Sequence, residues 1–237
     1  MNERRKQFKR VPKKYQPAGL TILYEDRDIL VVDKISGLLT VSSEKVRENT
    51  AYYRLTDYVR KGNRKSAKRI FIVHRLDRDT SGLIVFAKSE KSKHFLQEEW
   101  HGFQKIYTAL VHGAPVEKKG IITSYLAENR FHKMYSVTDS RKGKLARTGY
   151  KVVQESDRFS LLEVDLLTGK KNQIRVHMAD LGFPVAGDKK YGTGDRGIKR
   201  LMLHALSITL RHPHTKEKMT FEAELPVYFN ELVERKK

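Results

Sequence analysis

The chain has 237 residues, of which 39% are hydrophobic and 32% charged, and its formal net charge is +20. The length suits one large domain or two small ones, and the composition suits a soluble folded protein. The chain has no cysteine, which excludes disulfides, cysteine metal sites and thiol catalysis. Without a secretory signal or an apolar run near the roughly 18 residues of a membrane span, we expect a cytoplasmic protein with no membrane partner.

The positive charge is the strongest clue to a partner. It attracts polyanions at long range and neutralises phosphates on contact, so we expect nucleic acid; a basic surface kept for solubility, or for an anionic membrane, is the alternative. The patterning predicts a basic N-terminal arm at 1–18, a folded domain at 19–230 and a basic C-terminal tail at 231–237.

The first predicted elements are a β-hairpin and a helix. Residues 20–43, LTILYEDRDILVVDKISGLLTVSS, contain two β-rich runs with a turn at EDRD. Residues 50–62, TAYYRLTDYVRKG, have helical spacing and predict a helix that ends at Gly62. The next segment, NRKSAKR, is a dense basic patch whose candidate phosphate contacts are Arg64, Lys65, Lys68 and Arg69.

Residues 69–89, RIFIVHRLDRDTSGLIVFAKS, predict a polar loop between two buried strands. The apolar runs at 70–73 and 83–87 hold this loop, which carries Asp77 and Asp79. Such a carboxylate can cap the loop through its backbone amides or it can carry chemistry, and the residues alone leave both open for Asp77. Asp79 is the favoured cap.

The middle of the chain predicts one helix among strands. SEKSKHFLQEEWHG at 89–102 predicts a helix capped by Ser89 or Ser92, ended by Gly102 and buried through its apolar side chains, Phe95, Leu96 and Trp100. KIYTALVHG at 105–113 predicts a strand, and residues 121–153 predict shorter strands around polar loops. One of these loops, SRKGKLART, offers Lys142 and Lys144 to an RNA backbone.

Residues 160–182, SLLEVDLLTGKKNQIRVHMADLG, predict a strand, a turn and then a helix. The helix would start at an Asn172 cap, place Arg175 in its first turn, bury Ile174, Met178 and Leu181 on one face, and stop at Gly182. Two further strands are predicted at 201–213 and 218–226. Strands outnumber helices without βαβ alternation, which indicates an α+β domain with a mostly antiparallel sheet.

With these motifs in place, HRLDRDTSGLIVFAKS resembles the central motif of the RluA-type pseudouridine synthases. Four further segments resemble motifs of that family in the same order, over roughly residues 20–226: YEDRDILVVDKISGLLTVSS, KIYTALVHG, TGKKNQIRVHMADLGFPVAGDKKYG and LMLHA. The resemblance implies the pseudouridine synthase fold, an α+β fold with a mostly antiparallel mixed sheet, flanking helices and a central RNA-binding cleft.

The resemblance also implies an activity and its residues. Uridines in structured ribosomal or transfer RNA would become pseudouridine without a metal or an organic cofactor. Asp77 would be the essential carboxylate, Tyr107 would lie beside the target base, and Arg175 would pair with Asp77. Four further residues would shape the catalytic loop: His74, Arg75, Thr80 and Ser81. The chain departs from the family pattern at Ile35, commonly a proline, and at Lys171-Asn172, commonly a threonine-histidine pair.

The chemistry requires an ionised carboxylate in a site closed to water, and a base taken out of its stack. An arginine facing Asp77 keeps that carboxylate ionised, and its planar fork could hold it bidentately. Other roles remain open: Tyr107 could be an ordinary strand aromatic, and Arg175 a phosphate clamp.

Rival functions follow from the same residues. A non-catalytic RNA-binding or ribosome-assembly protein also fits the charge, and a nucleoside hydrolase would need Asp77 and Asp79 as an opposed pair, which residues two apart on a loop rarely form. A protein kinase is a third rival, but this chain lacks the glycine-rich nucleotide loop of that class. We expect no metal, because the histidines form no convincing ligand set: His74, His177, His204, His212 and His214. We also expect a monomer.

Overall fold

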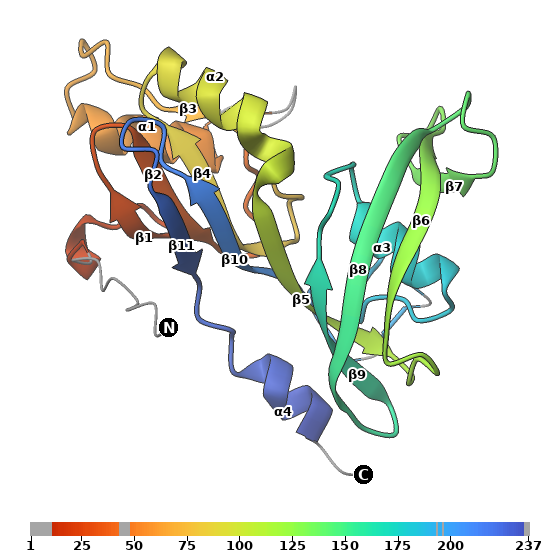
Figure 1. The fold of residues 1–237 in the computed structure, drawn as a ribbon. Helices are drawn as coiled ribbons and strands as arrows, with labels where there is room; N and C mark the ends of the chain where they lie inside the picture. Colours follow the sequence, from red (N-terminus) through yellow and green to blue (C-terminus); the bar gives the residue numbers. More distant parts are fainter. Residues whose placement is uncertain (1–10, 43–47, 193, 196, 235–237) are drawn as a thin grey trace.

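The computed structural model describes residues 11–42, 48–192, 194–195 and 197–234. Its described strands form one 11-stranded sheet in the order β1-β2-β4-β10-β5-β9-β8-β6-β7, with β3 on β4 and β11 on β10 (Figure 1). All neighbours are antiparallel except β4 and β10, which pair in parallel through Ser81 and Gly82 opposite His204 and Ala205. The predicted mostly antiparallel mixed sheet is confirmed.

The sheet has two halves that meet at β10 and β5. The first half contains β1 (Leu20–Glu25), β2 (Ile29–Lys34), β3 (Phe71–Ile72), β4 (Ser81–Ala87), β10 (Leu203–Arg211) and β11 (Lys218–Glu222). The second half contains β5 (Gln104–His112), β9 (Phe159–Asp165), β8 (Lys144–Glu155), β6 (Lys119–Glu128) and β7 (Met134–Val137). The predicted hairpin at 20–43 is confirmed as β1 and β2. The strands in 121–153 are longer than predicted, since β6 has 10 residues and β8 has 12.

Four α-helices flank the described sheet: α1 (Ala51–Arg60), α2 (Glu90–Glu98), α3 (Gln173–Asp180) and α4 (Tyr228–Glu234). Two 3-10 helices are η1 (Lys13–Tyr15) and η2 (Glu99–Gly102), so Gly102 ends η2 while α2 ends at Glu98. Helix α2 packs on β4, α3 on β7 and β8, and α4 on β9 (Figure 1).

The helix ends test the predicted caps. The hydroxyl of Ser89 accepts a hydrogen bond from the backbone N–H of Ser92 at 3.1 Å, so Ser89 is the cap of α2. Helix α1 ends at Arg60 rather than Gly62, because Lys61 already adopts the left-handed conformation with φ 51°. Leu181, predicted to be buried, caps the end of α3 and is 39% exposed.

Both faces of β2 and β4 are buried, which explains their continuous apolar runs. Leu30 and Val32 point into one core cluster, whereas Ile29 and Val31 point into the other. Gly82 allows β4 and β10 to approach, since its φ is +107° and a Cβ there would lie 2.3 Å from the carbonyl oxygen of Ala205. This close pairing with β10 fixes the start of β4, and with it the end of the loop that precedes β4.

The predicted ends of the domain need correction. Helix α4 includes residues 231–234 and Val233 is 2% exposed, so the boundary placed at residue 230 falls inside a packed helix. At the other end, Val11 packs against the core and the side chain of Gln16 bonds the backbone of Val11 and Ile22. Residues 1–10 of the predicted arm and 235–237 of the predicted tail lie outside the described residues. No described helix is long and apolar enough to cross a membrane.

Candidate active site

The loop that carries Asp77 is held by the segment that follows β2. The hydroxyl of Thr40 donates to the carbonyl of Leu76 at 2.8 Å, that of Ser36 donates to the carbonyl of Asp79 at 2.6 Å, and the N–H of Gly37 donates to the carbonyl of Arg78 at 2.9 Å. These bonds satisfy backbone groups that a polar loop would otherwise leave to water. The loop is therefore a fixed platform.

Lys34 lies under this platform and is fully buried. Its ammonium donates to the carbonyls of Ile35, Leu38 and Arg78 at 3.0, 2.8 and 3.1 Å. Burial lowers the pKa of Lys34 to about 8, although the nearby carboxylates Asp79 and Asp77 oppose this shift. One side chain thus connects both segments of the site.

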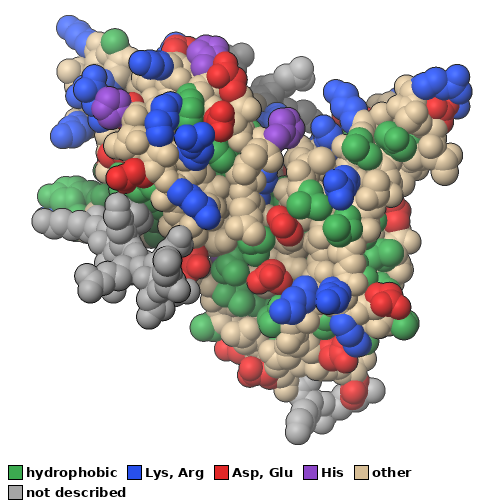
Figure 2. Space-filling view, in the orientation of Figure 1, with side chains coloured by type: hydrophobic (Ala, Val, Ile, Leu, Met, Phe, Trp, Pro, Cys, Tyr) green, Lys and Arg blue, Asp and Glu red, His purple; other side chains and the backbone are tan. Residues whose placement is uncertain are grey.

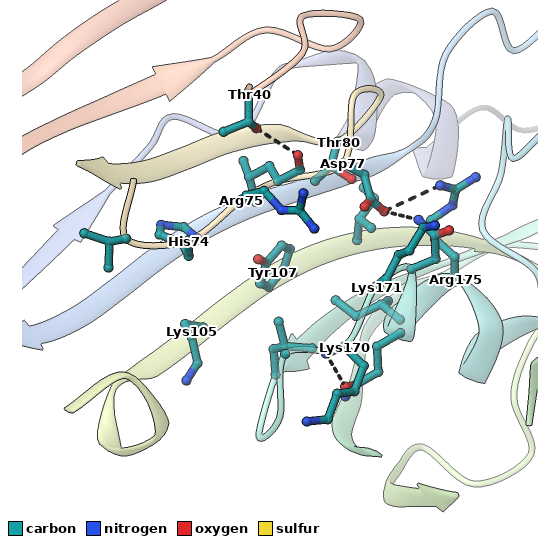
Figure 3. A pocket seen from close by; sticks show the side chains of 18 of the residues that line it. Thr40, His74, Arg75, Asp77, Thr80, Lys105, Tyr107, Lys170, Lys171 and Arg175 are labelled. Atoms are coloured by element: carbon teal, nitrogen blue, oxygen red, sulfur yellow. Dashed lines mark hydrogen bonds and ion pairs between the residues drawn. The ribbon is translucent and has the colours of Figure 1, made fainter. Parts of the chain in front are cut away.

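Asp77 lies on the wall of a cleft of about 630 Å³ between the two halves of the sheet (Figure 3). The apolar and aromatic part of the lining includes Leu76, Trp100, Tyr107, Leu166, Ile174 and Leu203. Among the described residues, Asp77 is the only acidic one of that lining, against five basic ones: Arg75, Lys105, Lys170, Lys171 and Arg175. The cleft therefore suits a flat, uncharged ring with an anionic attachment.

The Asp77 carboxylate is held through one oxygen only. Its Oδ2 accepts a hydrogen bond from Nδ2 of Asn172 at 2.6 Å and lies 3.5 Å from Nη1 of Arg175. No partner of Oδ1 is found among the described residues. The side chain is 29% exposed, so the second oxygen remains available at the cleft.

Arg175 makes its strong contact elsewhere. Its Nε and Nη2 donate to Oδ2 and Oδ1 of Asp188 at 2.7 and 2.8 Å, and Asp188 is fully buried in its side chain. Burial disfavours the ionised form of Asp188, but the hydrogen bonds and charge of Arg175 outweigh it and lower the pKa of Asp188. The expected contact of Arg175 with Asp77 is present through one nitrogen, but the bidentate geometry is not, because the fork holds Asp188.

The prediction missed Asp188 and the direct contact of Asn172 with Asp77. Asp188 lies in AGDKKYG, a turn whose backbone N–H groups at Lys190 and Tyr191 also donate to its Oδ1, at 2.8 and 3.0 Å. Since a buried carboxylate needs a charged partner, an acid within the arginine motif was the available signal. Asn172 was predicted as a helix cap, but its side chain makes no cap hydrogen bond.

Tyr107 lies on β5 with 9% of its surface exposed, and it lines the cleft beside Asp77 (Figure 3). Burial raises the pKa of its hydroxyl, and the negative charge of Asp77 raises it further. Tyr107 is therefore a neutral phenol whose ring forms part of the wall that faces the carboxylate.

Comparison with known proteins agrees with this arrangement. The family model described as RNA pseudouridylate synthase matches residues 28–180, more than half of the chain. The chain belongs to this family. It is similar to the uncharacterized RNA pseudouridine synthase YhcT of Bacillus subtilis (strain 168), with 38% identity over 211 residues that cover 87% of this chain and 69% of the relative.

Two further known proteins are similar to this synthase. The ribosomal large subunit pseudouridine synthase C of Buchnera aphidicola subsp. Schizaphis graminum (strain Sg) is 35% identical over 219 residues, 88% of this chain and 68% of the relative. The solved structure of human RNA pseudouridylate synthase domain containing 4 has a TM-score of 0.72 at 25% identity, and the match covers 88% of this chain and 90% of that one. The chain is thus an RNA pseudouridine synthase, an isomerase with the pseudouridine synthase fold.

The other predicted loop residues of the synthase lie in different surroundings. His74 lines the cleft, stacks on Trp100 with 4.2 Å between ring centres, and accepts a hydrogen bond from the N–H of Val85 at 3.0 Å. Burial, with the charge of Lys105, lowers the pKa of His74 to about 3, so the ring is neutral. The ring of His74 therefore forms part of the cleft wall.

Arg75 and Thr80 also line this cleft, with Arg75 exposed and Thr80 buried. Ser81 lines neither this cleft nor the one next to it, because its hydroxyl lies behind the loop, 2.8 Å from Nδ1 of His204 and 2.7 Å from Nη2 of Arg200. No bond from the side chain of Asp79 to the loop amides is found among the described residues, so the predicted cap is not formed there.

A second cleft of the synthase, of about 770 Å³, continues from the first. The two share four lining residues, Asp77, Lys171, Asn172 and Arg175. The second cleft adds five basic residues, Arg78, Lys189, Lys190, Lys199 and Arg200, and two acidic ones, Asp79 and Asp188. Burial lowers the pKa of Lys190, and the positive charges of Lys171 and Arg175 add to the effect, which indicates a positive local field.

The predicted phosphate contacts outside the clefts are exposed. Arg64, Lys65, Lys68 and Arg69 lie in the loop after α1, where Arg69 pairs with Glu90 at 3.6 Å. Lys142 and Lys144 lie at the turn between β7 and β8. Figure 2 shows Lys and Arg side chains gathered at the upper left of the molecule and at the tip of the upper right arm. Contact of these groups with RNA stays a prediction.

One described cluster has the spacing of metal ligands, Asp26, Asp28 and His212. Its atoms already have partners: Oδ1 of Asp26 accepts from two backbone N–H groups, and Oδ2 accepts from Tyr24 at 2.8 Å and pairs with Nε2 of His212 at 2.7 Å. The other ring nitrogen of His212 accepts from the turn amides of His214 and Thr215. These contacts form a polar turn at HPH, residues 212–214.

Proposed function

We propose that this synthase isomerises specific uridines in structured RNA, with Asp77 as the reacting carboxylate. The observation that carries the proposal is the placement of Asp77: Asn172 and Arg175 hold Oδ2, and Oδ1 remains open at an apolar-walled cleft. Asp77 is the only acid that the described residues contribute to that lining, so no second carboxylate in the first cleft competes for the role.

The reaction breaks the N1–C1′ bond of uridine and forms a C5–C1′ bond. C5 loses a proton and N1 gains one, so the product has the same mass as the substrate and no oxidant or water is consumed. The carboxylate of Asp77 can attack C1′, attack the uracil ring, or remove a sugar proton. All three routes need the ionised form, and Nη1 of Arg175 lies 3.5 Å from Oδ2 of that carboxylate.

The first cleft accommodates the uracil ring. Uracil inside a stacked helix is out of reach, so the enzyme takes the base out and holds it against apolar and aromatic side chains, at an unstacking cost of a few kcal/mol. Tyr107, Leu166 and Leu203 provide such a surface next to Asp77. The burial of Tyr107 and Leu203 also keeps water away from the reactive intermediate, which water would otherwise capture.

The second cleft accommodates the phosphodiester backbone on one side of the target nucleotide. It shares Asp77 with the first cleft, so a chain that places its base in one can continue into the other. Lys189 and Lys199 are exposed there, and their charges offset the cost of base extrusion through phosphate contacts.

Ribosomal RNA is the favoured substrate, and transfer RNA is the alternative. The name of the Buchnera relative, ribosomal large subunit pseudouridine synthase C, supports the first at 35% identity. The charge of +20 supports either polyanion. We also infer that the protein acts in the cytoplasm and as a monomer.

The test is a product assay on large-subunit ribosomal RNA and on transfer RNA, with nucleosides separated and identified after digestion. The wild-type chain forms pseudouridine without releasing uracil, whereas Asp77→Asn keeps the fold and the RNA affinity and loses activity by on the order of 10³-fold or more. Released uracil would indicate a hydrolase instead. RNA binding without any product would indicate the non-catalytic RNA-binding or ribosome-assembly protein.

A further inference from the structure

Asn172 has an unusual backbone for the residue that precedes a helix. It adopts the left-handed conformation with φ 52° and ψ 18°, whereas a capping asparagine has extended backbone and accepts from the helix amides. Its side chain makes no such cap and is 8% exposed. Because a non-glycine residue at positive φ carries a conformational cost, the surrounding contacts must compensate for it.

Those contacts fix the orientation of the Asn172 amide. The hydroxyl of Tyr191 lies 3.2 Å from Oδ1 of Asn172 and 3.0 Å from the backbone nitrogen of Met134. The Met134 N–H donates to the hydroxyl, so the single proton of Tyr191 is donated to Oδ1 of Asn172. The amide nitrogen must then face away from Tyr191, and it donates to Oδ2 of Asp77 at 2.6 Å.

We propose that Asn172 is a positioning residue that aims the Asp77 carboxylate. By occupying Oδ2, its amide leaves Oδ1 as the oxygen that faces the uridine. The proposal rests on the proposed function, in which Asp77 is the reacting group. It concerns one of the two positions at which this chain departs from the motif pattern described above.

Charge alone does not aim the carboxylate. Arg175 reaches Oδ2 with one nitrogen at 3.5 Å, beyond a good hydrogen bond, because its fork is committed to Asp188. Lys34 and Lys190 add positive charge near Asp77, and two neutral phenols, Tyr107 and Tyr191, lie in its field. Asn172 is the described residue that holds Asp77 by a short, directed side-chain hydrogen bond.

The main variant is Asn172→Gly, which removes the donor while glycine accepts the left-handed backbone without strain. We expect kcat to fall roughly 10- to 100-fold with KM for RNA nearly unchanged, since misplacement of a reacting group costs about this much. Asn172→His, which keeps an N–H donor at a position where histidine tolerates positive φ, restores part of kcat. A wild-type kcat in Asn172→Gly overturns the proposal.

A second variant separates aiming from simple support of the loop. Asn172→Asp keeps the size and replaces the donor by a like charge, which disfavours ionisation of the pair. We expect the acidic limb of the kcat profile to move to higher pH, whereas a side chain at 172 that supports the loop while facing away from Asp77 would leave the profile in place. An unmoved acidic limb in a folded variant counts against the proposal.

An NMR measurement tests the hydrogen bond without any activity. In wild-type protein we expect one side-chain amide proton of Asn172 to be shifted downfield and to exchange slowly, and to return to ordinary values in Asp77→Ala. If this resonance is the same in both proteins, the contact does not exist and the proposal fails. If it changes but wild-type protein forms no pseudouridine, the contact stands and the proposed function is what fails.

Discussion

The pair of Arg175 and Asp188 joins helix α3 to the turn at 188–191 below the site. Two parallel hydrogen bonds join the groups, and the guanidinium also lies 5.2 Å from the centre of the Tyr191 ring. Such a pair contributes little net stability against apolar residues of the same size, but breaking it leaves a buried charge. The arginine thus connects the turn at 188–191 to the carboxylate of Asp77.

We therefore expect Arg175→Met to lower the free energy of unfolding by about 3 to 5 kcal/mol, because Asp188 stays buried and unpaired. Arg175→Lys keeps the charge but loses the fork, and we expect a smaller loss of stability with most of the activity gone. Urea unfolding measures the first effect. The double variant Arg175→Met/Asp188→Asn should regain part of the stability; no recovery would show that Asp188 is not the source of the loss.

At this scale, the sequence predicted the residues of the site better than their contacts. Asp77, Tyr107 and Arg175 lie around one cleft, as their motifs indicated. The partner of Arg175 could not be predicted, because the fork has two acids within reach and only the three-dimensional packing decides that Asp188 is the deeper one. The same holds for Asn172, whose residue type favours a cap until its backbone conformation is known.

At the scale of elements, Lys34 connects the end of β2 to the loop before β4 through three carbonyls. We expect Lys34→Met to destabilise the fold by roughly 1 to 3 kcal/mol, because the hydrogen bonds of the ammonium to three carbonyls are lost. The removal of a buried charge offsets part of that loss. Hydrogen exchange should show faster opening at the amide of Gly37, which donates to Arg78.

The matched control is Lys118→Met, which removes an exposed lysine whose pair with Glu155 lies on the surface. We expect less than about 0.5 kcal/mol from it. Equal exchange rates at Gly37 in wild type and Lys34→Met would contradict the role of Lys34 as the connection between the two segments.

Elements with a strong periodic or apolar signal were predictable, and those with polar strands were less so. The buried runs of β2 and β4 follow from residue type alone, which also limited the cap of α2 to Ser89 or Ser92. By contrast, β6 and β8 alternate between exposed and half-buried positions, and their length comes from pairing with each other from Lys119 to Leu126. Such long-range pairing leaves a weak signal in a single sequence.

At the scale of the molecule, buried histidines predict acid sensitivity. Burial, with the charge of Arg200, lowers the pKa of His204 to about 4, against ~6.5 in an unfolded chain. Below ~6.5 the unfolded chain binds a proton that the folded chain does not, so this contribution to stability is lost as the pH falls from ~6.5 toward 4. Asp33, whose pKa burial raises to about 6, acts in the opposite direction.

A comparison of wild-type protein with His204→Gln separates the contribution of His204 from that of the other titrating groups. We expect the free energy of unfolding of wild-type protein to fall between pH 7 and pH 5 by up to ~2 kcal/mol more than that of His204→Gln. His101→Gln, at an exposed position, should follow the wild type. Identical pH dependence of His204→Gln and wild type would contradict this assignment.

The basic loop after α1 predicts a salt-dependent contribution to RNA binding. We expect the triple variant Arg64→Glu/Lys65→Glu/Lys68→Glu to bind RNA more weakly and to reduce the slope of log K against log salt by roughly 0.7 for each phosphate that is no longer neutralised. Fluorescence anisotropy over a range of salt concentrations measures the slope. An unchanged slope would remove this loop from the RNA-binding surface.

The second cleft makes a different prediction, because it shares Asp77 with the first. Reversing Lys189 and Lys199 to Glu should flatten the salt slope by roughly 0.7 for each phosphate they neutralise and also lower kcat/KM, since a backbone that is not held next to Asp77 cannot keep its base in the first cleft. Lys218→Glu, on β11 outside both linings, is the matched control for net charge. If the double variant loses no more affinity or activity than two such control reversals, the RNA backbone takes another path over the protein.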